Sequence, residues 1–283
     1  MVRWRKLGIL AGGGALPECI AASCAERAVA FHMIRIIGSA GPSLDALPGD
    51  NCGIGEIGKI LRILKTANCD AVVFAGAVKR PNFAGLKVDW RGAALMPKII
   101  SAAATGDGAL LGVLVDTVEA EGFLVIGADE AVQGLEAPSG VLGAHHPDEN
   151  DFRDIRKAAA IINALGPFDV GQAAVVADGF VIAIEAAEGT DGVLRRCTEL
   201  AADNGSGVRA GTLVKRPKPG QELRVDLPAI GPETIRKAEK AGLRGVAVEA
   251  GFALIIDRDE VVNCADKAGL FVYGFSNVDM GEP

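Results

Sequence analysis

The sequence predicts an α/β protein of two α/β domains joined by a linker, with a parallel sheet in the N-terminal domain and a mixed sheet in the C-terminal one. Three observations indicate this class. The chain has 283 residues, a length at which about two domains are expected. Apolar runs rich in Ala, Val, Ile and Leu alternate with helix-like segments, as in sheets crossed by helices. Hydrophobic residues make up 49% and charged residues 23%, which suits a globular protein with a sizeable core.

The N-terminal domain is expected over residues 1–133. Residues 6–11 read as a buried strand that runs into the loop Gly12-Gly13-Gly14, and a helix over 18–28 leads to a strand over 31–37. This order is a βαβ unit, the start of a Rossmann-like parallel sheet. Periodicity predicts further helices over 56–67, 91–104 and 107–122, and further strands over 70–75 and 123–126.

Residues 134–150 have the composition of a linker, and a C-terminal mixed α/β domain is expected over 151–275, with a frayed tail over 276–283. Asp178-Gly179 lies between two apolar runs and predicts a β-hairpin over 173–185. A second hairpin is predicted over 245–256. The remaining predicted elements are helices over 152–165, 190–202, 232–241 and 257–267, and strands over 211–214 and 270–273.

The composition argues against several functional classes. The formal net charge is -7, so no nucleic-acid partner is expected, because such binding depends on neutralising phosphates. The six cysteines form no C-x-x-C pair and no zinc spacing, which favours reduced thiols. The chain shows neither a signal peptide nor an apolar run of the roughly 18 residues that a membrane span needs. We therefore expect a soluble cytoplasmic protein.

Residues 215–231 (KRPKPGQELRVDLPAIG) concentrate cations, the amide of Gln221 and carboxylates between prolines and glycines. If the middle of this segment is extended, Glu222, Arg224 and Asp226 share one face, because side chains alternate along a strand. Lys215 and Arg224 would bind an anion there, and a carboxylate would hold a metal or a water. The alternative is a solvated strand edge with ordinary salt bridges, and the residues alone favour neither.

The loop that contains Gly12 and Gly13 follows the first strand, where backbone amides and a helix N-terminus can bind phosphate. The nicotinamide-binding fingerprint also needs a third glycine and an acidic residue about twenty positions later. This chain has neither at the expected place, since its second strand ends at Gly38-Ser39. A nucleotide or phosphate site is therefore favoured over both a dehydrogenase and a merely tight turn.

Gly76, Lys79 and Arg80 follow a predicted strand, at the end where open α/β sheets bind their ligands. For the two cations, phosphate contact and plain exposure to solvent are equally open. Asp107 is expected to cap the helix that follows Gly106.

Gln172 precedes one strand of the predicted hairpin, and Glu188, Gly189, Thr190 and Asp191 join the other strand to a helix. A glycine-containing junction with two carboxylates can bind a cation or a substrate hydroxyl. The alternative is an ordinary loop in which Thr190 or Asp191 caps the helix.

Several of these segments, taken in order and spacing, closely resemble the LpxI family of UDP-2,3-diacylglucosamine pyrophosphatases. The resemblance covers about residues 6–274, and its most specific block is 215–231. One departure is Gly108, where many relatives are expected to carry a second acid. The matching segments are 10–17 (LAGGGALP), 76–81 (GAVKRP), 106–111 (GDGALL), 188–191 (EGTD) and 215–231.

The resemblance implies a cytoplasmic enzyme of lipid A biosynthesis, with peripheral inner-membrane contact left open, that uses Mg²⁺ and holds its lipid substrate between two α/β domains. It cuts the pyrophosphate of UDP-2,3-diacylglucosamine to give lipid X and UMP. The family's essential aspartate falls on Asp226, with Lys215 and Arg224 expected to stabilise phosphate charge and Asp191 or Glu188 as a second metal ligand. The expected substrate-binding residues are Gly12, Gly13, Gly76, Lys79, Arg80, Asp107, Gln172, Glu188, Gly189, Thr190 and Gln221.

Two rival functions remain at this stage. A non-catalytic sensor would bind the same nucleotide-linked lipid without releasing UMP. A nicotinamide-dependent oxidoreductase is less favoured, because its fingerprint is incomplete.

Overall fold

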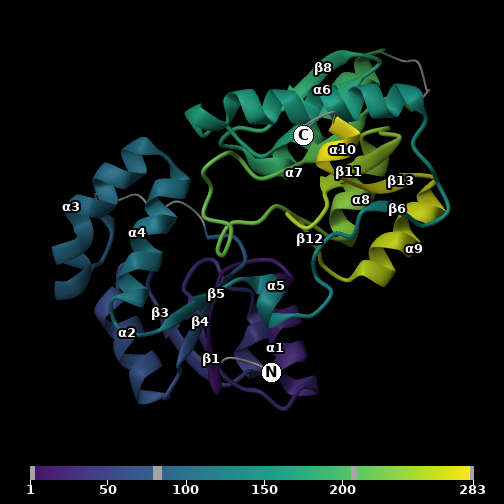
Figure 1. Ribbon diagram of the computed structural model, residues 1–283. Helices are drawn as coiled ribbons and strands as arrows, with labels where there is room; N and C mark the ends of the chain where they lie inside the picture. The colour runs from purple at the N-terminus through teal and green to yellow at the C-terminus, as the bar shows by residue number, and fades with distance from the viewer. Residues whose placement is uncertain (1–3, 79–84, 205–208, 281–283) are drawn as a thin grey trace. The chain divides into compact units, whose positions relative to one another are not determined.

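The structure is a computed structural model that describes residues 4–78, 85–204 and 209–280 (Figure 1). The chain divides into two compact units. The N-terminal unit contains Met1–Gln133 together with Arg224–Asp226, and the C-terminal unit contains Gly134–Leu223 and Leu227–Pro283. A short piece of the second half of the sequence therefore belongs to the first unit.

The N-terminal unit is built on a five-stranded parallel sheet of order β3-β2-β1-β4-β5. β1 is central, with Leu7 paired to Phe31 on one side and to Ala71 on the other. The three inner strands β2, β1 and β4 are rich in apolar residues, because helices cover both faces of the sheet. The strands are β1 (Lys6–Ala11), β2 (Ala30–Ile36), β3 (Gly49–Cys52), β4 (Ala71–Ala75) and β5 (Leu124–Ile126).

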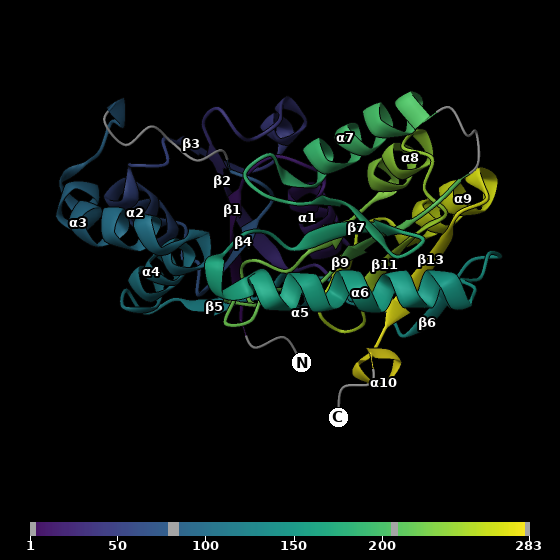
Figure 2. The ribbon, with the colours of Figure 1, turned by 90° about the horizontal axis from the view of Figure 1, so that it is seen from above.

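Two groups of helices cover this sheet (Figure 2). α1 (Leu16–Glu26) and α5 (Ala128–Ala131) pack together on one face. On the other face α2 (Ile57–Thr66), α3 (Trp90–Thr105) and α4 (Asp107–Glu119) share one apolar core with the strands. The short 3₁₀-helix η1 (Pro42–Ala46) lies between β2 and β3. The expected Rossmann-like parallel sheet is confirmed.

The C-terminal unit contains a six-stranded mixed sheet of order β6-β13-β11-β9-β7-β8. β9, β11 and β13 are parallel to one another, whereas β6 pairs antiparallel with β13, β7 with β9, and β8 with β7. The strands are β6 (Gly140–Leu142), β7 (Ala173–Ala177), β8 (Phe180–Ile184), β9 (Thr212–Lys215), β11 (Gly245–Glu249) and β13 (Phe271–Phe275). The mixed class expected for this half is confirmed.

Side chains of this sheet alternate between two cores. Ala174, Val176 and Val214 face α6 (Glu149–Leu165), while Val175 and Leu213 face the opposite group of helices. That alternation follows from the period of two along a strand, and Figure 2 shows α6 on one side of the sheet and three other helices opposite. The opposite helices are α7 (Gly189–Asn204), α8 (Pro232–Lys240) and α9 (Arg258–Ala268). η3 (Gly166–Phe168) extends α6.

The second predicted hairpin, over 245–256, is wrong. β11 lies between β9 and β13, and β12 (Leu254–Ile255) pairs instead with β10 (Ala229–Ile230) as a parallel ribbon. All five residues of β11 are buried. A strand buried on both faces reads as an unbroken apolar run, which looks the same in sequence whichever neighbours it pairs with.

Three local predictions also need correction. The segment 134–150, expected as a linker, belongs to the C-terminal unit and includes β6, paired with β13. The strand β3 was not predicted, because its sequence GDNC lacks an apolar pattern. The expected frayed tail contains α10 (Asn277–Met280), where the Asp279 carboxylate accepts hydrogen bonds from the amide and hydroxyl of Ser276. Among the described residues, no helix is long and apolar enough to cross a membrane.

Candidate functional site

Two glycine loops meet at the carboxyl ends of β1 and β4, where the strand order of the N-terminal sheet reverses. The Gly12 amide donates to the Ala75 carbonyl at 2.8 Å, and the Gly13 amide donates to the Ala77 carbonyl at 2.7 Å. A Cβ on Gly76 would lie 2.2 Å from the Gly13 oxygen, and φ of Gly76 is +82°. Such a close approach of two backbones excludes any side chain there.

The structure thus brings Gly12, Gly13 and Gly76 together at the place where open α/β sheets bind ligands. It also corrects one detail of the expectation. The amides of Gly12 and Gly13 already donate to backbone carbonyls, so these two amides do not form a phosphate cradle. Their role in the structure is to let the two loops pack against each other.

The structure adds little support for the other site residues predicted in this unit. Lys79 and Arg80 lie outside the described residues. Gly106 occupies the position before α4, and the helix begins at Asp107, so the expected capping role of Asp107 is wrong.

The middle of the segment 215–231 is not an extended strand, and the polar face expected there required one. Residues 223–225 form a turn, so alternation along a strand does not align Glu222, Arg224 and Asp226. A second turn lies before it, where the Lys218 amide donates to the Gln221 side-chain oxygen at 2.8 Å. Prolines and glycines in the segment favour such turns over a regular strand.

Lys215 holds the two ends of this segment together. It is the last residue of β9 and only 5% exposed. Its Nζ donates to the carbonyl of Ala229 at 3.0 Å. Beside it, the buried Arg216 guanidinium donates two hydrogen bonds of 3.1 Å to the Glu249 carboxylate, a bidentate geometry that fixes both side chains.

Arg224, Val225 and Asp226 belong to the N-terminal unit. Val225 packs against the apolar core of that unit, and Arg224 Nη1 lies 2.6 Å from Glu119 Oε1. Asp226 is half-buried. Of the three expected catalytic residues, the structure therefore places Arg224 and Asp226 in one unit and Lys215 in the other.

A hydrogen-bonded network in the C-terminal unit joins several of the expected substrate-binding residues around Glu185. This carboxylate is 7% exposed and accepts from the Gln172 amide and from Thr190 Oγ1, each at 3.0 Å. Gln221 Nε2 in turn donates to Gln172 Oε1 at 3.3 Å. The loop before β7 and the first turn of α7 are thereby bonded to one buried acid, and Gln221 is joined to it through Gln172.

The sequence reasoning missed Glu185, although a signal for it exists. It directly follows Ile184 at the end of an apolar strand, and charged residues are almost never fully buried unless paired. Gly171, next to it in space, has a φ of +155° and would place a Cβ 2.3 Å from the Glu185 carbonyl oxygen. Glycine is therefore required beside the network as well.

The two carboxylates of the 188–191 junction are engaged in ion pairs. Glu188 Oε1 lies 2.9 Å from Arg196 Nη2, and Asp191 Oδ2 lies 2.5 Å from Lys237 Nζ. The Asp191 side chain is 73% exposed, so its pair contributes little to stability. α7 begins at Gly189, which places Thr190 and Asp191 in the first turn instead of at the cap position that was expected.

The described residues contain no group of three or more His, Cys, Asp or Glu side chains arranged to hold a metal ion. That finding is compatible with Mg²⁺, which usually binds one or two carboxylates together with substrate phosphates and water. Asp226 and Asp191 belong to different units, and the ion pair with Lys237 would have to open before Asp191 became a ligand.

The four buried cysteines are not suited to nucleophilic catalysis. All six are free thiols. Burial raises the pKa of Cys24, Cys52 and Cys69, and it raises the pKa of Cys197 to about 11. Because the thiolate is the reactive form, these groups are inert near neutral pH.

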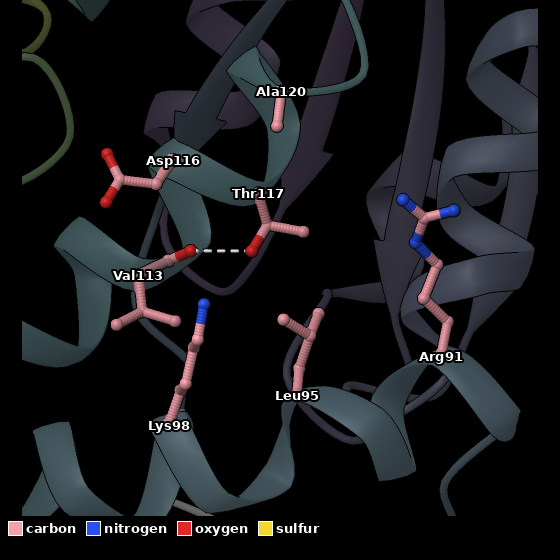
Figure 3. A pocket seen from close by; sticks show the side chains of 7 residues that line it. All are labelled: Arg91, Leu95, Lys98, Val113, Asp116, Thr117 and Ala120. Carbon is pink, nitrogen blue, oxygen red and sulfur yellow. Dashed lines mark hydrogen bonds between the residues drawn. The ribbon is translucent and has the colours of Figure 1, made fainter.

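A hollow of about 330 Å³ lies between α3 and α4 in the N-terminal unit (Figure 3). Leu95 and Lys98 point from α3 toward α4, where Thr117 Oγ1 donates to the Val113 carbonyl at 2.7 Å. Arg91 lies at one end and Asp116 at the other side. None of these residues was singled out from the sequence.

Comparison with known proteins identifies close relatives over nearly the whole chain. The family model of the LpxI N-terminal domain matches residues 6–135, and that of the LpxI C-terminal domain matches residues 138–273. The UDP-2,3-diacylglucosamine pyrophosphatase LpxI of Caulobacter vibrioides is 47% identical over 272 residues, which cover 95% of this chain and 97% of that protein.

Among solved structures, N5-carboxyaminoimidazole synthase from Aspergillus clavatus shares 12% identity, with a TM-score of 0.26. The match covers 66% of this chain and 42% of that one. A likeness this weak carries no argument about function.

Proposed function

The chain belongs to the LpxI family, and from that premise we propose that it hydrolyses the pyrophosphate of UDP-2,3-diacylglucosamine in lipid A biosynthesis. Water adds to one phosphorus and the P–O–P bridge breaks, giving 2,3-diacylglucosamine 1-phosphate (lipid X) and UMP. The observation that carries this proposal is the 47% identity to a pyrophosphatase over 95% of the chain, together with matches to both LpxI domains.

The chemistry of the named residues supports the proposal. A pyrophosphate diester is doubly anionic, so hydrolysis requires that charge be neutralised and that the attacking water be positioned. We propose that Asp226 orients this water or holds Mg²⁺. Lys215 and Arg224 would stabilise the negative charge on the phosphates. Mg²⁺, held by Asp226 and substrate oxygens with Asp191 as a further candidate ligand, would supply electrostatic stabilisation.

The network around Glu185 is proposed to hold polar groups of the substrate through Gln172, Thr190 and Gln221. The junction residues Glu188 and Gly189 and the loops at Gly12, Gly13, Gly76, Lys79, Arg80 and Asp107 complete the proposed substrate-binding set. The proposed location is the cytoplasm, with peripheral contact at the inner membrane, because the substrate carries two acyl chains.

Replacing Asp226 tests the mechanism directly. In Asp226→Asn we expect kcat for UMP release to fall at least about 100-fold, the order of effect seen when a positioned catalytic group is removed, with substrate affinity retained. Asp116→Asn, which changes an exposed carboxylate on α4 of the same unit, is the matched control and should keep wild-type kcat. Activity of Asp226→Asn within about tenfold of wild type would contradict the assigned role.

Metal removal tests the cofactor separately. Chelation should abolish turnover, and added Mg²⁺ should restore it. The thermal unfolding midpoint should not change, because the described residues contain no preformed three-ligand site that could contribute folding energy. Full activity after exhaustive chelation would remove Mg²⁺ from the mechanism.

A further inference from the structure

The outward face of α3 is apolar. Trp90 is 73% exposed and Ile100 is 51% exposed, and Val88 just before the helix is 39% exposed. The other exposed side chains along this face are small: the apolar Ala93, Ala94, Pro97 and Ala104, and the polar Ser101. Their spacing of three or four residues places them in one stripe along the helix.

The charge of this region is opposite to that of the whole chain. α3 contains Arg91 and Lys98 and no acidic residue, and the exposed Lys87 precedes it. Asp89, just before the helix, uses its carboxylate to accept hydrogen bonds from the amides of Gly92 and Lys59. Arg91 is ion-paired with Glu121, and Lys98 lines the hollow of Figure 3. In a chain with a net charge of -7, the exposed Lys87 is thus the cation beside the apolar helix face.

The side chains of α3 are divided between this stripe and the neighbouring helix. Lys98 and Leu95 point toward α4 and line the hollow of Figure 3. Ile99 and Ala103 are buried in the core of the unit. One side of α3 therefore packs in the core, a second side lines the hollow, and the stripe is the side that is exposed.

The extent of the stripe argues against a second copy of the chain as its occupant. α3 has 16 residues, which makes it ~24 Å long and ~10 Å wide, a footprint of ~240 Å². A stable interface needs ~800 Å² from each partner. A bilayer has no such requirement, because an amphipathic helix with tryptophan on its apolar face and cations beside it can lie in the interfacial region of a membrane.

We propose that the stripe Val88–Trp90–Ile100 of α3 docks the protein on an anionic lipid bilayer. This inference rests on the proposed function, in which the substrate is a two-chain lipid that must be drawn from a membrane. Trp90 and Ile100 enter the interfacial region, and Lys87 attracts anionic head groups. The contact is peripheral and reversible.

Vesicle sedimentation with the full-length protein tests this contact. The probes are vesicles of phosphatidylglycerol and phosphatidylethanolamine, compared with vesicles of phosphatidylcholine alone. Wild-type protein should bind the anionic vesicles more tightly, and more weakly as salt is raised. The double variant Trp90→Glu/Ile100→Glu should lose at least about tenfold in partition, since two apolar side chains no longer insert.

Phe180→Glu is the matched control, because Phe180 is 74% exposed on β8 of the other unit and has no proposed role. It should bind vesicles like wild type. Equal binding by the α3 double variant, or no binding of wild type to anionic vesicles, would overturn the proposal. So would a wild-type dimer that the double variant converts to a monomer, because the stripe would then bind a second copy.

Rates of hydrolysis on dispersed and on vesicle-embedded substrate test the docking surface separately from the proposed function. On a short-chain substrate that is dispersed in water, the double variant should hydrolyse at the wild-type rate, whereas on substrate embedded in anionic vesicles its rate should fall at least about tenfold. If wild type hydrolyses neither form, the proposed function fails while the vesicle-binding result still decides the docking surface.

Discussion

At the scale of single residues, the C-terminal unit depends on one buried acid. Glu185 accepts hydrogen bonds from the Gln172 amide and from Thr190 Oγ1, and thereby fixes the loop before β7 to the start of α7. Removing it would leave a half-buried amide and hydroxyl without their acceptor, which costs about 1–3 kcal/mol per group. Glu185 is therefore a positioning residue for Gln172 and Thr190.

We expect Glu185→Ala to raise KM about tenfold with kcat changed far less, because the loops that bind substrate are displaced while Asp226 is untouched. Glu185→Gln should recover most of the loss, since its side-chain oxygen can still accept from the Gln172 amide. Steady-state kinetics of the two variants make the comparison. If alanine and glutamine variants are equally impaired in kcat, Glu185 takes a direct part in the chemistry.

At the scale of elements, the N-terminus of α6, the helix that covers one face of the C-terminal sheet, is held by a capping box. Asp148 precedes it and accepts from the amides of Asn150 and Asp151, while the Asp151 carboxylate accepts from the Asp148 amide. Arg244 donates to both carboxylates. The hydrogen bond from the Asp151 amide, with Arg244 nearby, lowers the pKa of Asp148.

We expect Asp148→Ala to reduce the free energy of unfolding by about 1 kcal/mol, and Asp148→Asn to reduce it by less, because asparagine still caps. A lowered pKa means that the stabilisation by Asp148 is complete above its ordinary value. It is lost as pH falls below about 4, through the folded-state pKa. Thermal unfolding at pH 7 and at pH 3 checks both points. If the stability difference between wild type and Asp148→Ala were the same at pH 3 as at pH 7, the ionised carboxylate of Asp148 would not be the source of the stabilisation.

At the scale of the whole molecule, the chain leaves one compact unit and returns to it within the segment 215–231. Lys215 and Ala229 are joined in the C-terminal unit. Between them, Val225 packs against the N-terminal core, and Arg224 pairs with Glu119. The proposed catalytic Asp226 is thus held in the N-terminal unit by a three-residue anchor.

We expect Val225→Asp to lower kcat at least about tenfold, because a charge placed against the apolar core would release the anchor and move Asp226. Leu223→Asp is the matched control: Leu223 is 37% exposed and belongs to the other unit. Steady-state kinetics measures the fall in kcat, and limited proteolysis of residues 215–231 measures the release of the anchor. Wild-type kcat in Val225→Asp would show that the anchor does not position Asp226.

Much of the local structure follows from the sequence alone. Four of the parallel strands of the N-terminal unit (all but β3), the helices between them and the hairpin at Asp178-Gly179 are each encoded by apolar periodicity and turn residues within a short window. The family is likewise evident from motifs such as residues 215–231. The loops of Gly12 and Gly76 could be expected to meet, because both follow parallel strands.

Only the tertiary structure decided which strands pair and which residues share a site. β11 and β12 follow each other in sequence yet pair with β9, β13 and β10, because a buried apolar run does not specify its neighbours. Glu185 gains its role from Gln172 in the loop before β7 and from Thr190 in the first turn of α7. Arg224–Asp226 belongs to a unit more than ninety residues earlier in the chain. Local pattern determines an element, whereas long-range packing determines its partners.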